Sequence, residues 1–174
     1  MKKNFPFLSI LAALALVAGS CHNVNPRRTA ASNASAAAQT VEQNKAIVLQ
    51  LYAALNDTNW VVARGLVDSG FQHHYVKDTG FGVTSWSGFE RGYRASQQAF
   101  PDWKLRPVTV VAEGEYVSVL LVGQGTQRGD FAGIAATNRK AGAPIMLLHQ
   151  LRNGKIIADW EVMNVASFVE QLKK

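Results

Sequence analysis

His149 is the residue whose type and position best suit chemistry in this chain. It precedes Asn153-Gly154, the strongest short signal for a two-residue hairpin turn in the sequence. Pairing outward from that turn places His149 opposite Ala158, with Trp160 as its diagonal neighbour. Because an imidazole titrates near neutral pH, His149 is either a base in a ligand pocket or a buried core histidine that makes one hydrogen bond.

Alternation along this predicted hairpin sorts its side chains onto two faces. The first face is almost entirely apolar and is expected to point into the core; it holds Ile145, Leu147, His149, Leu151, Ile156, Ala158, Trp160 and Val162. The second face is expected to point outward and holds Met146, Leu148, Gln150, Ile157, Asp159 and Glu161. Its apolar members are too many to leave in water, so we expect the protein to dimerise through the sheet.

Aromatic side chains are natural walls for a pocket that takes a hydrophobic small molecule. Five of them are candidates for ligand contact: Trp60, Trp86, Phe100, Phe131 and Trp160. The competing interpretation is that each of them is an ordinary core residue.

The elements that must position these residues are predicted from apolar spacing. Helices are expected at residues 40–55, 58–66, 87–100 and 165–172. Capping boxes at Thr40–Gln43 and Ser87–Glu90 mark two helix starts, and Asp57 can cap the second helix. Period-two stretches predict strands at residues 108–112, 116–123, 144–151 and 155–163. Helices followed by a run of antiparallel strands indicate an α+β fold, in which helices close one side of a curved sheet.

The first residues of the chain predict export. Lys2-Lys3 precedes an apolar run, Phe5–Val17, which has the length of a signal peptide and is short for a membrane span. Ala18-Gly19-Ser20-Cys21 resembles the lipobox of bacterial lipoproteins, in which the cysteine becomes an acylated N-terminus. Ordinary cleavage after Ser20 is the alternative, and both interpretations place the protein outside the cytoplasm.

Three segments follow from this interpretation. We expect a signal peptide at residues 1–20, a flexible tether anchored by lipid on Cys21 at residues 21–40, and one folded domain at residues 41–174. The tether is rich in Asn, Ser, Ala and Thr and has no apolar periodicity. The expected location is therefore a membrane surface on the periplasmic or outer side, or the periplasm or medium if Cys21 is not acylated.

Charge argues against a nucleic-acid partner. The formal net charge is +6, but four of the eighteen basic residues lie in residues 1–40. The remaining fourteen face twelve acidic residues, which leaves about +2 and no clustered basic face.

Neither a metal nor a cofactor is expected. Cys21 is the one cysteine of the sequence, so a disulfide within the chain and a thiolate metal site are excluded. The histidines of the folded domain lack close acidic partners in the sequence. Gly123, Gly125 and Gly129 follow a strand but precede no helix, which argues against a phosphate-binding loop.

Five short motifs occur in an order and spacing that resemble a known family. They are Phe71-Gln72-His73-His74, Ala99-Phe100-Pro101-Asp102, Val111-Ala112-Glu113-Gly114, Gly129-Asp130-Phe131-Ala132-Gly133 and Asn153-Gly154-Lys155-Ile156-Ile157-Ala158-Asp159-Trp160. Together they resemble the SnoaL-like polyketide cyclases of the nuclear transport factor 2-like superfamily, over roughly residues 41–172.

This resemblance implies a cone-shaped α+β barrel that is often dimeric through its sheet, and a cofactor-free ring closure by an intramolecular aldol reaction. It implies that His74 is a first-strand polar group at the pocket mouth; the alternative is a strand-edge residue that faces solvent. Because side chains alternate along a strand, His73 is expected on the opposite face. It also places Asn164 where the family has its acidic residue. An amide does not titrate, so Asn164 can donate a hydrogen bond to a carbonyl oxygen or cap the helix that begins at Val165.

Two functions remain open at this stage. In the first, the protein is a cyclase or isomerase that moves a proton on a small carbonyl compound, with His149 as the base, Asn164 or His74 as the hydrogen-bond donor, and Trp160 as a wall. In the second, it is a non-catalytic module of the same fold that binds a small molecule or a partner at the membrane surface.

Overall fold

The structure is a computed structural model and describes residues 26–173 of the chain. The predicted signal peptide and Cys21 lie outside these residues. The elements in chain order are α1 (Pro26–Asn56), α2 (Trp60–Leu66), β1 (Val67–Lys77), β2 (Gly80–Ser85), α3 (Trp86–Ala99), β3 (Lys104–Glu113), β4 (Tyr116–Thr126), β5 (Lys140–Arg152), β6 (Lys155–Met163) and α4 (Val165–Lys173).

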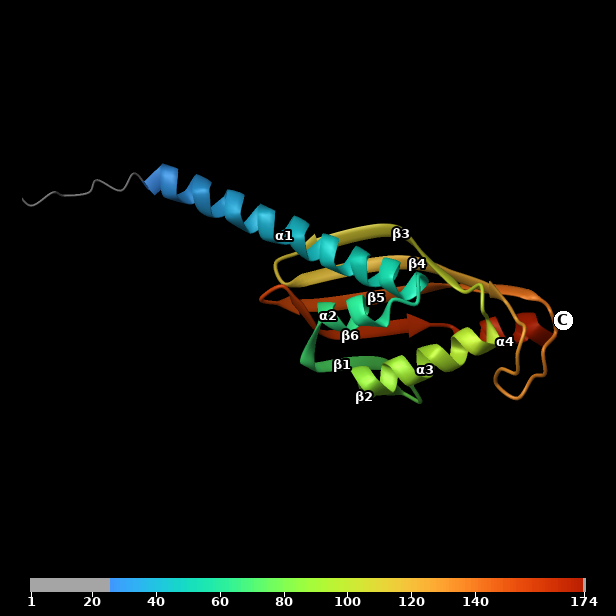
Figure 1. The fold of residues 1–174 in the computed structure, drawn as a ribbon. Helices are drawn as coiled ribbons and strands as arrows, with labels where there is room; N and C mark the ends of the chain where they lie inside the picture. Colours follow the sequence, from blue (N-terminus) through green and yellow to red (C-terminus); the bar gives the residue numbers. More distant parts are fainter. Residues whose placement is uncertain (1–25, 174) are drawn as a thin grey trace, which may run out of the picture.

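All six strands belong to one curved sheet in the order β2-β1-β6-β5-β4-β3. Neighbouring strands are antiparallel except for β1 and β6, which are parallel. Helix α1 packs on β3 and β4, α3 packs on β1 and β2, and α4 packs on β5 (Figure 1). This arrangement confirms the predicted α+β fold class, a cone of helices on a curved and mainly antiparallel sheet.

The core lies between α1 and the inner face of the sheet. Val48, Leu51 and Leu55 share one face of α1 because they are three or four residues apart, and each is at most 3% exposed. They pack in one cluster with Val117 and Val119 of β4, which are fully buried. Each such side chain contributes about 1.5–3 kcal/mol by leaving water, so this seam fixes α1 on the sheet.

The first helix is longer than expected. We predicted an irregular tether as far as residue 40, but α1 begins at Pro26, and the hydroxyl of Thr40 donates to the carbonyl of Ala36 instead of capping a helix start. The physical reason is composition, since residues 30–40 are rich in alanine, the strongest helix former. Extending an existing helix also requires no new nucleation.

Two further helix starts differ from the predictions. Helix α2 is capped by Asn59, whose side chain accepts from the amide of Val62, and not by Asp57. Helix α3 begins at Trp86, one residue before the predicted capping box. The carboxylate of Glu90 cannot close that box because it accepts hydrogen bonds from Arg64, Trp86 and Arg94.

The four predicted strands correspond to β3–β6, each observed strand being at least as long as predicted. Strands β1 and β2 were not predicted from periodicity. β1 carries several exposed polar residues, and β2 is an edge strand with no buried residue, so neither has the apolar alternation of a half-buried strand.

No helix among residues 26–173 is both long enough and apolar enough to span a membrane.

The hairpin of β5 and β6 contains a bulge that decides which side chains face the core. Asn153 and Gly154 have φ values of 51° and 71°, as the predicted tight turn requires, and Leu151 pairs with Ile156 as expected. The next pair is Gln150 with Ala158, so Ile157 is an extra residue on β6. From Ala158 onward the predicted register is therefore wrong by one residue, and His149 pairs with Asp159.

The bulge exchanges the two predicted faces of β6, since side chains alternate strictly along a strand. Asp159 and Glu161 were expected to point outward but line a cavity on the inner side of the sheet. Val162 was expected to point inward but is 51% exposed.

Candidate functional site

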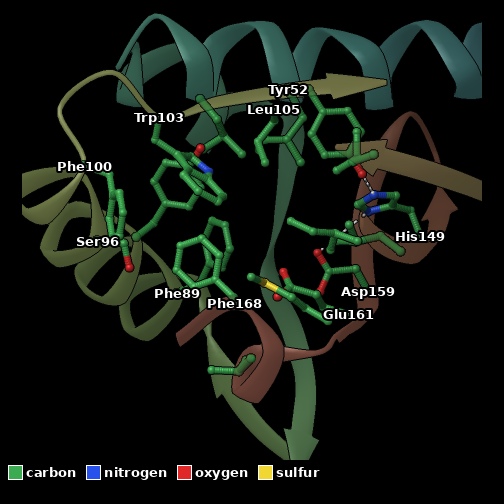
Figure 2. A pocket seen from close by; sticks show the side chains of 18 of the residues that line it. Tyr52, Phe89, Ser96, Phe100, Trp103, Leu105, His149, Asp159, Glu161 and Phe168 are labelled. Carbon is green, nitrogen blue, oxygen red and sulfur yellow. Dashed lines mark hydrogen bonds and ion pairs between the residues drawn. The ribbon is translucent and has the colours of Figure 1, made fainter. Parts of the chain in front are cut away.

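A cavity of about 240 Å³ lies between the inner face of the sheet and helices α1, α3 and α4. Most of its lining is apolar or aromatic; the residues are Leu51, Tyr52, Leu55, Phe89, Tyr93, Ser96, Phe100, Trp103, Leu105, Leu121, Phe131, Ile145, Leu147, His149, Asp159, Glu161, Met163, Val165 and Phe168. Figure 2 shows Tyr52, His149, Asp159 and Glu161 together on one side, facing Trp103 and Phe100. The cavity therefore has an aromatic side and a polar, titratable side.

The aromatic side is built from edge-on ring contacts. Phe100 packs on Trp103, Phe131 and Phe168, with ring centroids 5.8, 5.2 and 5.4 Å away. Phe100 and Trp103 lie between α3 and β3, Phe131 lies between β4 and β5, and Phe168 lies on α4. Three separate segments therefore close the same wall. Phe100 and Phe131 were predicted as ligand contacts, and both line the cavity.

Four side chains connect in a row at the polar side. The hydroxyl of Tyr52, on α1, is hydrogen-bonded to Nε2 of His149, on β5. Nδ1 of His149 lies 3.7 Å from one carboxylate oxygen of Asp159, and the other oxygen accepts a 2.7 Å hydrogen bond from Nδ1 of His73. All four side chains are buried, so their charges and dipoles interact more strongly than they would in water.

The carboxylate of Asp159 fixes the tautomer of His149. An ionised carboxylate only accepts hydrogen bonds, so the nitrogen that faces it is best protonated. Nε2 then carries the lone pair and accepts a hydrogen bond from the Tyr52 hydroxyl. Complete burial lowers the pKa of His149 to about 4, against the small opposing effect of Asp159, so the ring is neutral at pH 7.

The partner of His73 favours the charged form of its ring. Burial acts to lower its pKa, but the hydrogen bond to Asp159 and the charges of Asp159 and Glu161 outweigh burial and raise the pKa of His73 above its usual value. His73 and Asp159 thus form a buried ion pair behind the cavity wall, with no net charge.

Glu161 has the least restrained carboxyl group of the cavity. It is half-buried and lines the cavity, and no hydrogen bond to it is found among residues 26–173. Burial raises its pKa, with a smaller opposing effect from the charge of His73 and a further increase from Asp159. A carboxylate that is a stronger base than usual and is accessible from an apolar cavity can exchange protons with a bound molecule.

Comparison with known proteins identifies the family to which the chain belongs. The sequence model described as SnoaL-like polyketide cyclase matches residues 45–172. The chain belongs to this SnoaL-like family. This match confirms the resemblance drawn from the five motifs. A search of curated proteins returns no match.

Solved structures agree with the family at the level of the fold. IdmH from Streptomyces antibioticus, a candidate polyketide cyclase, is 22% identical with a TM-score of 0.69, covering 76% of this chain and 99% of its own. AclR from Streptomyces galilaeus, a candidate hydroxylase, is 20% identical with a TM-score of 0.69 and coverages of 76% and 97%. A SnoaL-like polyketide cyclase from Agrobacterium tumefaciens is 19% identical with a TM-score of 0.60 and coverages of 74% and 97%. At these identities the likeness establishes the fold alone.

Asn164 occupies the position where the family resemblance placed an acidic residue, and it lies outside the cavity lining of this SnoaL-like protein. Its side-chain oxygen accepts a 2.9 Å hydrogen bond from the amide of Ser167, three residues on, and its backbone oxygen accepts from the amide of Phe168. These are the contacts of a helix N-cap on α4. The geometry therefore favours the cap over a contact with a ligand.

His74 does not lie at the pocket mouth either. The two histidines of β1 face opposite sides of the sheet, as predicted, but His73 is the one that points inward. His74 stacks on Trp160, with ring centroids 4.7 Å apart, and donates to the backbone carbonyl of Asp159. Neither His74 nor Trp160 lines the cavity, because the bulge at Ile157 turns Trp160 to the outer face.

Trp60 and Trp86, the two remaining predicted contacts, belong to a neighbouring aromatic cluster. Their ring centroids lie 6.4 Å apart, and the guanidinium of Arg94 covers the ring of Trp60 at 4.4 Å. The indole nitrogen of Trp86 donates to Glu90. Both tryptophans are core residues beside the cavity rather than part of its lining.

Five polar residues of the cavity were not proposed as site residues by the sequence analysis: Tyr52, Tyr93, Ser96, Asp159 and Glu161. Tyr52 lies on the buried face of α1. A buried tyrosine hydroxyl needs a hydrogen-bond partner, and this need was the available signal for a polar contact in the core. The two carboxylates lie two residues apart on one strand, a spacing that puts both on one face whichever way that face points.

No group of three His, Cys, Asp or Glu side chains within residues 26–173 is arranged to hold a metal ion.

Proposed function

We propose that this SnoaL-like domain is a cofactor-free enzyme of the cyclase or isomerase type that moves a proton on a small carbonyl compound. The observation that supports the proposal is the Glu161 carboxyl group in a largely apolar cavity, next to the buried pair of Asp159 and His73. A carbon acid next to a carbonyl needs a positioned base of raised pKa and a site that excludes water.

Glu161 replaces His149 as the proposed base. Both nitrogens of His149 are accounted for, since Nε2 accepts from Tyr52 and Nδ1 faces Asp159, and its pKa of about 4 makes it a weak base. The carboxylate of Glu161 would remove the proton from the carbon next to the carbonyl and leave an enolate. In a cyclase, that enolate would attack a second carbonyl carbon, and the alkoxide formed there would take the proton back from Glu161. In an isomerase, the enolate would take the proton back at another carbon.

His73, Asp159, His149 and Tyr52 are positioning residues in this proposal. The ion pair of His73 and Asp159 joins β1 to β6. It also compensates the negative charge of Asp159, the carboxylate next to Glu161 on the same face of β6. Without His73, the charge of Asp159 would be uncompensated and would raise the pKa of Glu161 further.

The alternative function is a non-catalytic module that binds a hydrophobic small molecule in the same cavity. The observation that favours it is Asn164, which has a cap role where the family resemblance placed an acid. The two functions share the cavity and differ in whether Glu161 exchanges protons with the ligand.

Deuterium exchange separates them. Proton NMR of acetophenone in D₂O follows the loss of its methyl signal with and without the protein. We expect the wild-type protein to accelerate exchange and Glu161→Gln to lower the rate by about 10²–10⁴-fold, the usual contribution of a general base. The matched control, Glu115→Gln, makes the same change at an exposed position and is expected to have no effect.

Each of the other outcomes has a definite meaning. Exchange by Glu161→Gln at the wild-type rate would contradict the assignment of the base. Binding of acetophenone without any acceleration of exchange would establish the alternative, a binding module.

We further propose that the protein is exported and anchored to a membrane through acylated Cys21. The basis is the lipobox-like sequence, and helix α1 would then act as a spacer: residues 34–40 are exposed, and residues 26–40 span about 22 Å at 1.5 Å per helical residue. Intact mass measurement of membrane-extracted protein is expected to show two or three acyl chains on an N-terminal Cys21. Unmodified Cys21 in the soluble fraction would leave plain secretion as the answer.

A further inference from the structure

Tyr93 presents a hydroxyl group that has no partner. It lies on α3 and lines the cavity, and its hydroxyl oxygen is buried without any hydrogen bond from residues 26–173. Buried polar groups are nearly always hydrogen-bonded, because an unmade bond costs the full desolvation of the group. An unpaired hydroxyl on a cavity wall therefore points to a partner that enters the cavity.

The other hydroxyl groups of the cavity already have partners within the protein. The hydroxyl of Tyr52 bonds to His149. The hydroxyl of Ser96, one turn along α3 from Tyr93, donates to the carbonyl of Gly92 at 3.1 Å. Nδ1 of His149 is also without a hydrogen bond, but it faces the carboxylate of Asp159. Among the described hydroxyl groups that line the cavity, that of Tyr93 is thus the one without a partner in the protein.

Packing holds the phenol ring of Tyr93 in place. The ring lies edge-on to Trp60 and tilted on Phe89, with centroid distances of 5.7 Å in both cases. Burial, and after it the charge of Glu161, raise the pKa of Tyr93, so the hydroxyl keeps its proton at neutral pH. A fixed and always protonated hydroxyl donates to an oxygen acceptor without losing rotational freedom on binding.

The charges of the cavity restrict the ligand further. The described residues that line it include the carboxyl groups of Asp159 and Glu161 but no lysine or arginine. An anionic ligand would bury its charge beside these groups with no cation to compensate it, which is strongly unfavourable. The volume of about 240 Å³ exceeds the roughly 150 Å³ that suffices for benzene, so a substituted ring fits.

We propose that the Tyr93 hydroxyl donates a hydrogen bond to the carbonyl oxygen of an uncharged aromatic ligand, and that the cavity selects such a ligand over its carboxylate counterpart. Tyr93 is then the residue that determines specificity, and it holds the oxygen on which negative charge develops when Glu161 takes the neighbouring proton. The inference rests on the proposed cavity function, but it concerns binding and holds with or without turnover.

Three probes of similar size test the proposal by calorimetric titration of the purified protein. Acetophenone carries the ring and the carbonyl, isopropylbenzene replaces the carbonyl by an apolar group, and benzoate replaces it by a carboxylate. Wild-type protein is expected to bind acetophenone more tightly than isopropylbenzene, and benzoate at least tenfold more weakly than acetophenone.

Tyr93→Phe removes the hydroxyl and keeps the ring. It is expected to lower the affinity for acetophenone about fivefold to tenfold, the net effect of one hydrogen bond, and to leave the affinity for isopropylbenzene unchanged. The melting temperature should stay the same or rise, because the variant no longer buries an unpaired hydroxyl. Tyr116→Phe is the matched control: it makes the same change at a tyrosine that is 43% exposed and does not line the cavity, and both affinities should stay as in the wild type.

Several results would overturn the inference. An equal loss for both neutral probes would mean that Tyr93 acts through packing, and no loss for either would mean that it does not contact the ligand. Benzoate binding as tight as acetophenone binding, or no binding of either neutral probe by the wild type, would contradict the ligand class.

The outcome is separable from that of the proposed function. If Tyr93→Phe binds acetophenone as the wild type does while Glu161→Gln loses deuterium exchange, the proposed function stands and this inference fails. If the binding pattern holds and the wild type does not catalyse exchange, the inference stands and the enzymatic proposal fails.

Discussion

His73 and His149 lie on either side of Asp159, and their surroundings move their pKa values in opposite directions. Both rings are buried, so the difference between their pKa shifts comes from the hydrogen bond that only His73 makes to Asp159. His73 donates to the carboxylate at 2.7 Å, and its pKa is raised, whereas His149 stays 3.7 Å away, and burial lowers its pKa to about 4. Asp159 therefore supports one imidazolium and orients one imidazole, and Glu161 is left as the titratable group that no hydrogen bond among the described residues occupies.

Asp159→Asn is expected to destabilise the protein strongly. It removes one partner of a buried ion pair, a change that typically costs about 3–5 kcal/mol in the free energy of unfolding. The folded-state pKa of His73 is raised, so its stabilising effect is complete below the usual value of about 6.5 and is lost as pH rises through the raised pKa. The penalty of Asp159→Asn should therefore be larger at pH 5.5 than at pH 9.

Urea unfolding at both pH values measures this penalty. The matched control is Asp130→Asn at an exposed position, which should change the free energy of unfolding by less than about 0.5 kcal/mol. A penalty for Asp159→Asn that is constant with pH, or that grows as pH rises, would show that His73 is not charged by its partner.

At the level of elements, the bulge at Ile157 is the feature that sequence periodicity could not reveal. Ile156 and Ile157 are both apolar, so the pattern is compatible with either register. The uninterrupted register also puts Trp160 in the core, which is the ordinary expectation for a tryptophan. Stacking of Trp160 on His74, from a strand that lies distant in the sequence, stabilises the alternative and is a tertiary effect.

The elements that could be predicted are those with strong local signals. The Asn153-Gly154 turn located His149 correctly on the inner face, and the helix ending before Pro101 located Phe100. The pairing of β1 with β6 joins residues more than 80 apart in the chain and leaves no local signal, so the contact of His73 with Asp159 was out of reach.

Asn164→Ala tests the assignment of Asn164 as a helix cap. We expect it to lower the free energy of unfolding by about 1 kcal/mol, because the amide of Ser167 loses its acceptor at the start of α4. Acetophenone binding and deuterium exchange should change little, since Asn164 does not line the cavity. A loss of exchange at unchanged stability would return Asn164 to the site.

At the scale of the whole molecule, the outer face of the sheet remains apolar. Met146, Leu148 and Val162 are 47, 38 and 51% exposed on β5 and β6, where Met146 pairs with Val162. The bulge moves Val162 to this face, and it takes the place of Glu161, which the predicted register had put there. The face is thus more apolar than the sequence suggested, and dimerisation through it stays a prediction.

Leu148→Glu is expected to disrupt such a dimer by placing a charge in the apolar contact. Sedimentation at micromolar concentration should give a dimer for the wild type and a monomer for the variant. Val61→Glu is the matched control, because Val61 is 86% exposed on α2, away from the sheet face. A monomeric wild-type protein would contradict dimerisation through this face.

A crystal structure of the protein with bound acetophenone tests the central claim most directly. The account predicts the ring among Phe100, Trp103 and Phe168, and the carbonyl oxygen within hydrogen-bond distance of the Tyr93 hydroxyl. The methyl carbon should then lie about 3–3.5 Å from a carboxylate oxygen of Glu161, the separation of a reactive geometry. Density for the ligand outside the cavity, or a bound ligand whose methyl carbon points away from Glu161, would contradict the claim that this cavity is a proton-transfer site.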